Sequence, residues 1–133
     1  MKYLLDTGVW LRGAKEPETL PTRIRNLLGE PGLIHAVSDI SLWEVAMLSA
    51  KGRIDLPLPC AEWQRQALRG IRVLPITPEI AEDAVTLARF HPDPADRLIT
   101  ATARQHNLTL ITTDRDIRDS RQVPARFFKF KTA

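Results

Sequence analysis

The 133-residue chain lacks several features that mark particular classes of protein. Its single cysteine, Cys60, excludes an internal disulfide and is compatible with a reducing compartment. No apolar run approaches the roughly 20 residues that a membrane-spanning helix needs. Only Lys2 and a short apolar run precede Asp6, so no signal peptide is expected. We therefore expect a cytoplasmic protein.

Repeats, low-complexity tracts and long linkers are also missing from the sequence. A mass of 15.0 kDa is enough to bury roughly two thirds of the unfolded surface, so we expect a single domain over residues 1–133. The three histidines, His35, His91 and His106, lack the spacing of metal ligands. Neither they nor Cys60 has an evident catalytic partner, so they offer no rival mechanism.

What the sequence does contain is a regular alternation of strand and helix patterns. Short apolar segments bounded by Gly, Pro or Asp predict strands at 2–6, 33–37, 73–76, 108–112 and 126–130. Apolar residues at helical spacing predict helices at 22–28, 41–51, 61–68, 78–90 and 94–106, and residues 51–59 read as an exposed loop. Because strands separated by helices pair in parallel through crossovers, we expect an α/β fold.

Four acidic residues lie near the ends of these elements: Asp6, Glu44, Asp96 and Asp114. Asp6 and Asp114 each close an apolar strand pattern. The carboxyl ends of parallel strands meet at one edge of a sheet, where ligands bind, so these carboxylates are expected to converge. Like charges that close together require a cation.

Glu44 is the most unusual of the four, because it is the only ionisable side chain between Ser41 and Ala50. A carboxylate on such an apolar helix is costly to bury unless it is paired or coordinated. The alternative is a first-turn glutamate favoured by the helix dipole, with Ser41 or Asp39 as the cap.

The other acids have structural explanations of their own. Asp93 is placed to cap a helix whose first residue is Pro94, which makes Asp96 a third-position acid. Thr112 and Asp114 form an Asp/Thr turn pattern. The apolar face that follows Asp96 nevertheless docks its helix on the sheet and aims the first turn at the same edge.

Basic residues dominate once the four acids are set aside, because 19 Lys and Arg then face 12 of the 16 acidic residues. Arg97 directly follows Asp96, and Arg115 directly follows Asp114. Guanidinium groups there could clamp the phosphates of a polyanionic partner. The alternative is a set of solvated surface charges.

Together these residues resemble the PIN-domain ribonucleases, and among them the VapC-type toxins of bacterial toxin–antitoxin pairs. The matching segments are YLLDT at 3–7, VS at 37–38 with SLWE at 41–44, HPDPADR at 91–97, and LITTD at 110–114. The chain departs from many relatives at 47–49, where they carry a lysine. The resemblance implies a PIN-like three-layer α/β/α sandwich with a central, mainly parallel sheet of about five strands.

The resemblance also assigns roles to the acids. It implies that Asp6, Glu44, Asp96 and Asp114 bind one or two Mg²⁺ or Mn²⁺ ions, with Asp116 as an auxiliary ligand. Carboxylates are suited to such hard cations, which activate water for phosphodiester hydrolysis. Thr112 could orient that water or a phosphate oxygen. The resemblance implies RNA as the substrate, cut to leave a 3′-hydroxyl and a 5′-phosphate, although the residues themselves do not exclude DNA.

Two partners follow from the same resemblance and from the apolar helix. Trp43, Met47 and Leu48 point in directions that one small sheet cannot fully bury, so some apolar surface should remain. An antitoxin is expected to cover an apolar groove and reach the acids with a basic side chain, and a homodimer could account for part of the surface.

Two other functions stay open from the residues alone. A different metal-dependent phosphohydrolase would also gather acids at strand ends, although Thr7 and Gly8 follow Asp6 where a haloacid-type phosphatase needs Asp-x-Asp. A non-catalytic α/β interaction protein would use its acids as caps and its tryptophans as contacts. Metal-dependent cleavage of RNA distinguishes a ribonuclease from both of these alternatives.

Overall fold

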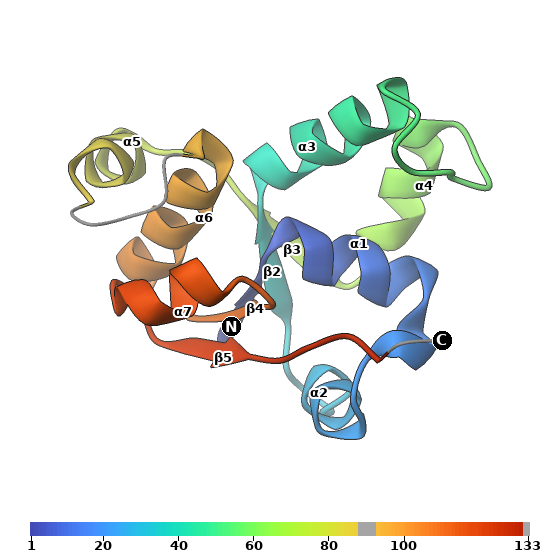
Figure 1. The fold of residues 1–133 in the computed structure, drawn as a ribbon, viewed down its shortest axis with the longest axis horizontal. Coiled ribbons are helices and arrows are strands. Elements are labelled where there is room, and N and C mark those ends of the chain that lie inside the picture. Colours follow the sequence, from blue (N-terminus) through green and yellow to red (C-terminus); the bar gives the residue numbers. More distant parts are fainter. Residues whose placement is uncertain (88–92, 132–133) are drawn as a thin grey trace.

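A parallel sheet of five strands forms the centre of the molecule (Figure 1). The computed structural model describes residues 1–87 and 93–131. The strands run in the order β3-β2-β1-β4-β5, and every neighbouring pair is parallel. Their bounds are β1 (Tyr3–Leu5), β2 (His35–Ser38), β3 (Ile71–Leu74), β4 (Thr109–Thr112) and β5 (Ala125–Phe127). The predicted parallel α/β fold is confirmed, with bounds that shift by a few residues.

Helices cover both faces of the sheet. They are α1 (Thr7–Lys15), the 3₁₀ turn η1 (Pro17–Thr19), α2 (Thr22–Leu28), α3 (Asp39–Ala50), α4 (Cys60–Ala67), α5 (Pro78–Thr86), α6 (Pro94–Gln105) and α7 (Arg115–Ser120). In Figure 1, α5, α6 and α7 lie to the left of the sheet, and α1, α3 and α4 lie to its right. The helix predicted at 78–90 ends at Thr86, and its last predicted residues, like His91, lie outside the described residues.

Two core layers result from the alternation of side chains along each strand. Leu5 faces a cluster that includes Trp10 of α1 and Val45 of α3. Leu4 faces the opposite cluster, which includes Ile99 of α6 and Ile117 of α7. All six side chains are buried, so the three-layer arrangement is confirmed.

The structure differs from the sequence-based expectations in three local details. Helix α3 is capped by Ser38, whose Oγ accepts from the Ile40 amide at 3.3 Å, and not by Ser41 or Asp39. Helices α1 and α7 were not predicted, because each begins directly after an acidic cap that reads as a turn. The loop between α3 and α4 is not fully exposed, since its apolar residues Ile54, Leu56 and Leu58 pack partly against the core.

The start of α6 and the burial of two of the three tryptophans agree with the expectations from the sequence. Asp93 caps α6 and Pro94 is its first residue, as predicted. Trp10 and Trp63 are buried, whereas Trp43 on α3 is 58% exposed. No helix within the described ranges is both long and apolar enough to cross a bilayer.

Candidate active site at the carboxyl edge of the sheet

Two acids are brought together by the pairing of β1 with β4. Leu5 lies in register with Ile111, and the Asp6 amide donates to the Ile111 carbonyl at 3.1 Å. Asp6 therefore leaves the sheet beside the end of β4, where Asp114 follows two residues after the last strand residue, Thr112. Each acid then begins a helix, as the N-cap of α1 and of α7 respectively.

The Asp6 carboxylate is held on both oxygens and is only 8% exposed. Oδ1 accepts from the Val9 amide at 2.8 Å, and Oδ2 accepts from the Thr112 hydroxyl. The pKa of Asp6 is raised to about 6, mainly by burial and to a smaller extent by the charge of Asp114, against the lowering effect of the hydrogen bonds. A cation placed here would offset both unfavourable effects.

Thr112 links the two acids. Its Oγ1 accepts from the Asp114 amide at 3.0 Å while its hydroxyl donates to Asp6. The Asp114 side chain accepts from the amides of Asp116, at 2.8 Å, and Ile117, at 3.3 Å, at the start of α7. Asp116 itself lies exposed in that first turn. The capping role and the place in the acidic site are thus compatible, although the sequence presents them as alternatives.

Glu44 approaches from α3 and is half-buried. It is the sixth residue of that helix, so the alternative of a first-turn glutamate is wrong. Its Oε1 accepts from the Thr7 hydroxyl, and Thr7 Oγ1 lies 2.8 Å from Ser41 Oγ. Burial is the main cause that raises the pKa of Glu44, and the charge of Asp93 adds to it.

Asp96 lies in the first turn of α6, which packs against α3. Its amide donates to Asp93 Oδ1 at 3.1 Å, and the Ala95 amide donates to the same oxygen at 2.9 Å. The charge of Asp93 acts on Glu44, so the start of α6 and the middle of α3 form a second acidic pair.

The acids thus lie as two pairs, Asp6 with Asp114 and Glu44 with Asp93. Across residues 1–87 and 93–131, no three acidic, histidine or cysteine side chains are close enough together to hold one ion. The donors are nevertheless carboxylate and hydroxyl oxygens, which suit Mg²⁺ or Mn²⁺ rather than zinc or copper. The raised pKa of Asp6 beside Asp114 is a further sign that positive charge fits here.

The two arginines predicted to contact phosphate differ in their surroundings. The Arg97 guanidinium donates to three carbonyls at the end of α5: Ala84 at 2.8 Å, Val85 at 3.1 Å and Leu87 at 2.9 Å. These bonds give Arg97 a structural role, tying α5 to α6. Arg115 is exposed at the first position of α7, directly after Asp114.

Thr7 and Ser41 are site residues that the sequence did not indicate as such, since Ser41 was expected only as a helix cap. Their signal was present, since Thr7 directly follows Asp6 and Ser41 lies three residues before Glu44 on the same helical face. Hydroxyl residues at those places are common in caps and turns, so only the structure shows that they meet.

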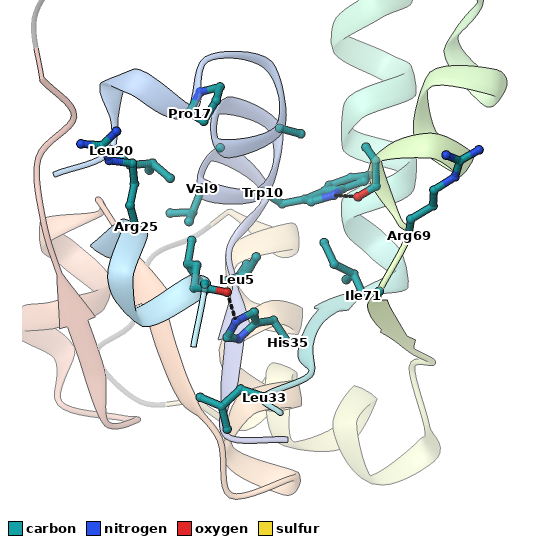
Figure 2. Close-up of a pocket in the computed structure, with 16 residues that line it drawn as sticks. Leu5, Val9, Trp10, Pro17, Leu20, Arg25, Leu33, His35, Arg69 and Ile71 are labelled. Atoms are coloured by element: carbon teal, nitrogen blue, oxygen red, sulfur yellow. Dashed lines mark hydrogen bonds between the residues drawn. The ribbon is translucent and has the colours of Figure 1, made fainter. Parts of the chain in front are cut away.

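A pocket of about 450 Å³ lies at the opposite end of the sheet (Figure 2). His35 and Ile71, the first residues of β2 and β3, line it together with Trp10, Arg25 and Arg69. His35 Nε2 lies 2.8 Å from the Leu28 carbonyl and donates to it, since that oxygen can only accept. No acid of the site lines this pocket, so it is separate from the acidic edge.

Comparisons with known proteins agree with this geometry. Residues 3–121 match the PIN domain family. The chain is 39% identical over 119 residues to Ribonuclease VapC22 of Mycobacterium tuberculosis, covering 89% of this chain and 91% of that protein.

Solved structures agree as well. A toxin–antitoxin complex from Klebsiella pneumoniae contains a chain that is 26% identical, with a TM-score of 0.65 over 92% of this chain and 95% of that one. A chain of VapBC2 from Rickettsia felis, bound to a promoter DNA fragment, is 16% identical, with a TM-score of 0.75 over 97% of this chain and 100% of that one. The first likeness supports the relationship, and the second shows the shared fold. The chain therefore belongs to the PIN-domain family, among its VapC-type members.

Proposed function

We propose that this chain is an endoribonuclease toxin that uses Mg²⁺ or Mn²⁺, with Asp6, Glu44, Asp96 and Asp114 as the residues that hold the ion. Asp116 is an auxiliary ligand in this proposal. The observation that carries it is the buried Asp6 carboxylate, which Thr112 links to Asp114 at the ends of adjacent strands. The similarity to Ribonuclease VapC22 supports RNA as the substrate.

The chain's own residues divide the work of phosphodiester hydrolysis. When bound, one or two ions supply Lewis acidity that activates water and offsets the charge of the phosphate. Asp6 and Asp114 bind from the strand ends, and Glu44 binds from α3. Thr112 holds Asp6 in place and presents its hydroxyl oxygen beside the site. Exposed Arg115 is available to a phosphate of the substrate.

An antitoxin is the partner that this function requires in a cell. The solved relatives include a toxin–antitoxin complex, which supports such a partner here. Exposed Trp43, with half-buried Met47 and Leu48, leaves apolar surface on α3 for an antitoxin or for a second copy in a homodimer. A basic antitoxin side chain entering the acids would replace the charge of the ion and compete with it.

The test is cleavage of RNA by the purified protein, with and without Mg²⁺ or Mn²⁺, followed by mapping of the ends. We expect metal-dependent cuts that leave 3′-hydroxyl and 5′-phosphate ends, and none with Asp6→Asn. A single-stranded DNA of the same sequence and a phosphomonoester serve as competing substrates. Cleavage of DNA alone, hydrolysis of the monoester alone, or no metal-dependent activity at all would refute the proposal. Expression of the wild type, but not of Asp6→Asn, should arrest growth of a host cell.

A further inference from the structure

A chain of two buried hydroxyl groups ends on Glu44. Ser41 is fully buried and Thr7 is 7% exposed, and the two come from different helices, α3 and α1. Ser41 and Glu44 are three residues apart, so both side chains project from one side of α3. Thr7 meets both of them, with Oγ1 in hydrogen-bond distance of Ser41 Oγ and of Glu44 Oε1.

The direction of the two hydrogen bonds that join Ser41, Thr7 and Glu44 follows from counting protons. An ionised carboxylate can only accept, so the single hydroxyl proton of Thr7 is committed to Glu44. The 2.8 Å contact between Thr7 and Ser41 must then use the proton of Ser41. Ser41 therefore donates to Thr7, and Thr7 donates to Glu44.

The same arrangement occurs at the other acidic pair. Thr112 accepts from the Asp114 amide and donates to Asp6, as Thr7 accepts from Ser41 and donates to Glu44. Thr7 also directly follows Asp6, whose carboxylate is fixed by the Val9 amide. One residue thus connects the backbone that carries Asp6 with the side chain of Glu44.

We propose that Thr7 is a positioning residue that fixes the Glu44 carboxylate relative to Asp6, and that Ser41 fixes Thr7. The hydrogen bond to Oε1 restrains the rotamer of Glu44 and leaves its second oxygen to a divalent ion. This inference rests on the proposed function, because it assigns Thr7 to the support of a metal ligand. Partners that orient a ligand in this way commonly change metal affinity by about 10-fold to 100-fold when they are removed.

The test measures Mn²⁺ affinity by calorimetry on folded variants, without any turnover. Thr7→Val keeps the shape of the side chain and removes the hydroxyl, so we expect the Kd for Mn²⁺ to rise about 10-fold. Thr7→Ser keeps the hydroxyl and should restore affinity to within about twofold of the wild type. Ser41→Ala should raise the Kd by a smaller factor, about threefold, since it removes only the bond that orients Thr7.

Thr102→Val is the matched control, because Thr102 is also buried but donates to the Leu98 carbonyl within α6. Its Kd for Mn²⁺ should stay within about twofold of the wild type. The proposal is overturned if folded Thr7→Val binds Mn²⁺ as the wild type does, or if Thr7→Ser fails to restore binding. If Thr7→Val does not fold, an unchanged Kd in Ser41→Ala overturns it instead.

Failure of the inference differs from failure of the proposed function. A wild type that binds Mn²⁺ and cuts RNA, with an unaltered Kd in Thr7→Val, refutes only the role of Thr7. A wild type that binds no Mn²⁺ refutes the metal-dependent function as well. A role limited to joining α1 and α3 would lower the melting temperature of Thr7→Val while leaving its metal affinity unchanged.

Discussion

The two acidic pairs are built by different means. Asp6 and Asp114 follow strands that are hydrogen-bonded to each other, so the sheet itself fixes their backbones. Glu44 comes from helix α3 and Asp93 is the N-cap of α6, and the relative position of these two helices depends on packing. Asp6 is almost fully buried, whereas Glu44 is half-buried and Asp93 is exposed. We call the first the strand pair and the second the helix pair.

The difference indicates which of the acidic side chains needs further contacts to fix its position. In the strand pair, the Asp6 side chain is held on both oxygens by groups of neighbouring segments. In the helix pair, Glu44 extends from a longer side chain with more rotamers, and its placement relies on the Thr7 hydroxyl. Changes to the strand pair should therefore act on charge and stability, and changes to the helix pair should act on positioning.

Loss of either type of ligand should produce the largest effect. We expect Asp6→Asn and Glu44→Gln each to lower the rate of metal-dependent RNA cleavage by more than about 100-fold, the upper range for residues that only support a ligand. Raising Mn²⁺ should restore part of the rate in Glu44→Gln and little in Asp6→Asn, because the strand pair supplies the more rigid ligand. Initial rates across a Mn²⁺ titration measure both.

Circular dichroism is the control for that experiment, since both variants should remain folded. Equal recovery of the two variants at high Mn²⁺ would contradict the proposed difference between the pairs. Full activity in either variant would remove that residue from the site.

The second effect is a pH-dependent cost at Asp6. Its pKa in the folded chain is about 6, above the ordinary 3.8, so the folded state binds the proton more tightly than the unfolded state does. The stability that Asp6 contributes is fully present below about pH 4 and is lost as the pH rises through 6. Above pH 6, ionisation of the buried carboxyl group therefore lowers the free energy of unfolding by about 3 kcal/mol, since each pKa unit corresponds to about 1.4 kcal/mol.

Asp6→Asn removes that cost. In the presence of a chelator, the free energy of unfolding of Asp6→Asn minus that of the wild type should therefore increase between pH 4 and pH 7, as measured by urea denaturation. Asp55→Asn, a change of an exposed aspartate in the loop between α3 and α4, is the control and should show no such trend. A difference that falls with pH would mean that hydrogen bonds to the Asp6 carboxylate outweigh its burial.

The same contrast explains what could be predicted from the sequence. Asp6 and Asp114 end apolar strand patterns, and parallel strands must bring such ends to one edge, so the strand pair follows from topology. The fold followed from the same alternation of elements. The hydroxyl chain from Ser41 to Glu44 did not, because it depends on how α1 packs against α3. The structural role of Arg97 could not be predicted either. Arg97 donates to carbonyls at the end of α5, and nothing in the sequence around Asp96 and Arg97 indicates that this helix end lies nearby.

A divalent metal ion should stabilise the folded chain by about as much free energy as ionisation of Asp6 removes. At about 100 times its dissociation constant, an ion that binds only the folded state adds about 2.7 kcal/mol to the free energy of unfolding. We expect millimolar Mg²⁺ or Mn²⁺ to raise the melting temperature of the wild type. The rise should nearly vanish in Asp6→Asn and should be reduced in Thr7→Val. An unshifted wild type would argue against a preformed metal site.

The smallest expected effects separate the two arginines. Arg97→Ala should lower the free energy of unfolding by about 2 kcal/mol, because it removes charged hydrogen bonds to carbonyls at the end of α5. Arg115→Ala should leave stability nearly unchanged. It should instead flatten the slope of log RNA affinity against log salt concentration by about 0.7, the value for one lost contact with a single strand. Urea denaturation and salt titrations of RNA binding, performed with Asp6→Asn to prevent cleavage, measure the two effects.

Arg69→Ala is the matched control for the salt titration, since Arg69 is also exposed but lines the pocket at the opposite end of the sheet. The slope of log RNA affinity against log salt concentration in this variant should equal that of the parent protein, because RNA bound at the acidic edge is not expected to contact that pocket. A flatter slope in Arg97→Ala than in Arg115→Ala would reverse the assignment and return the phosphate contact to α6. Equal flattening in all three arginine variants would mean that RNA binds through the general charge of the surface and not through a contact beside the strand pair.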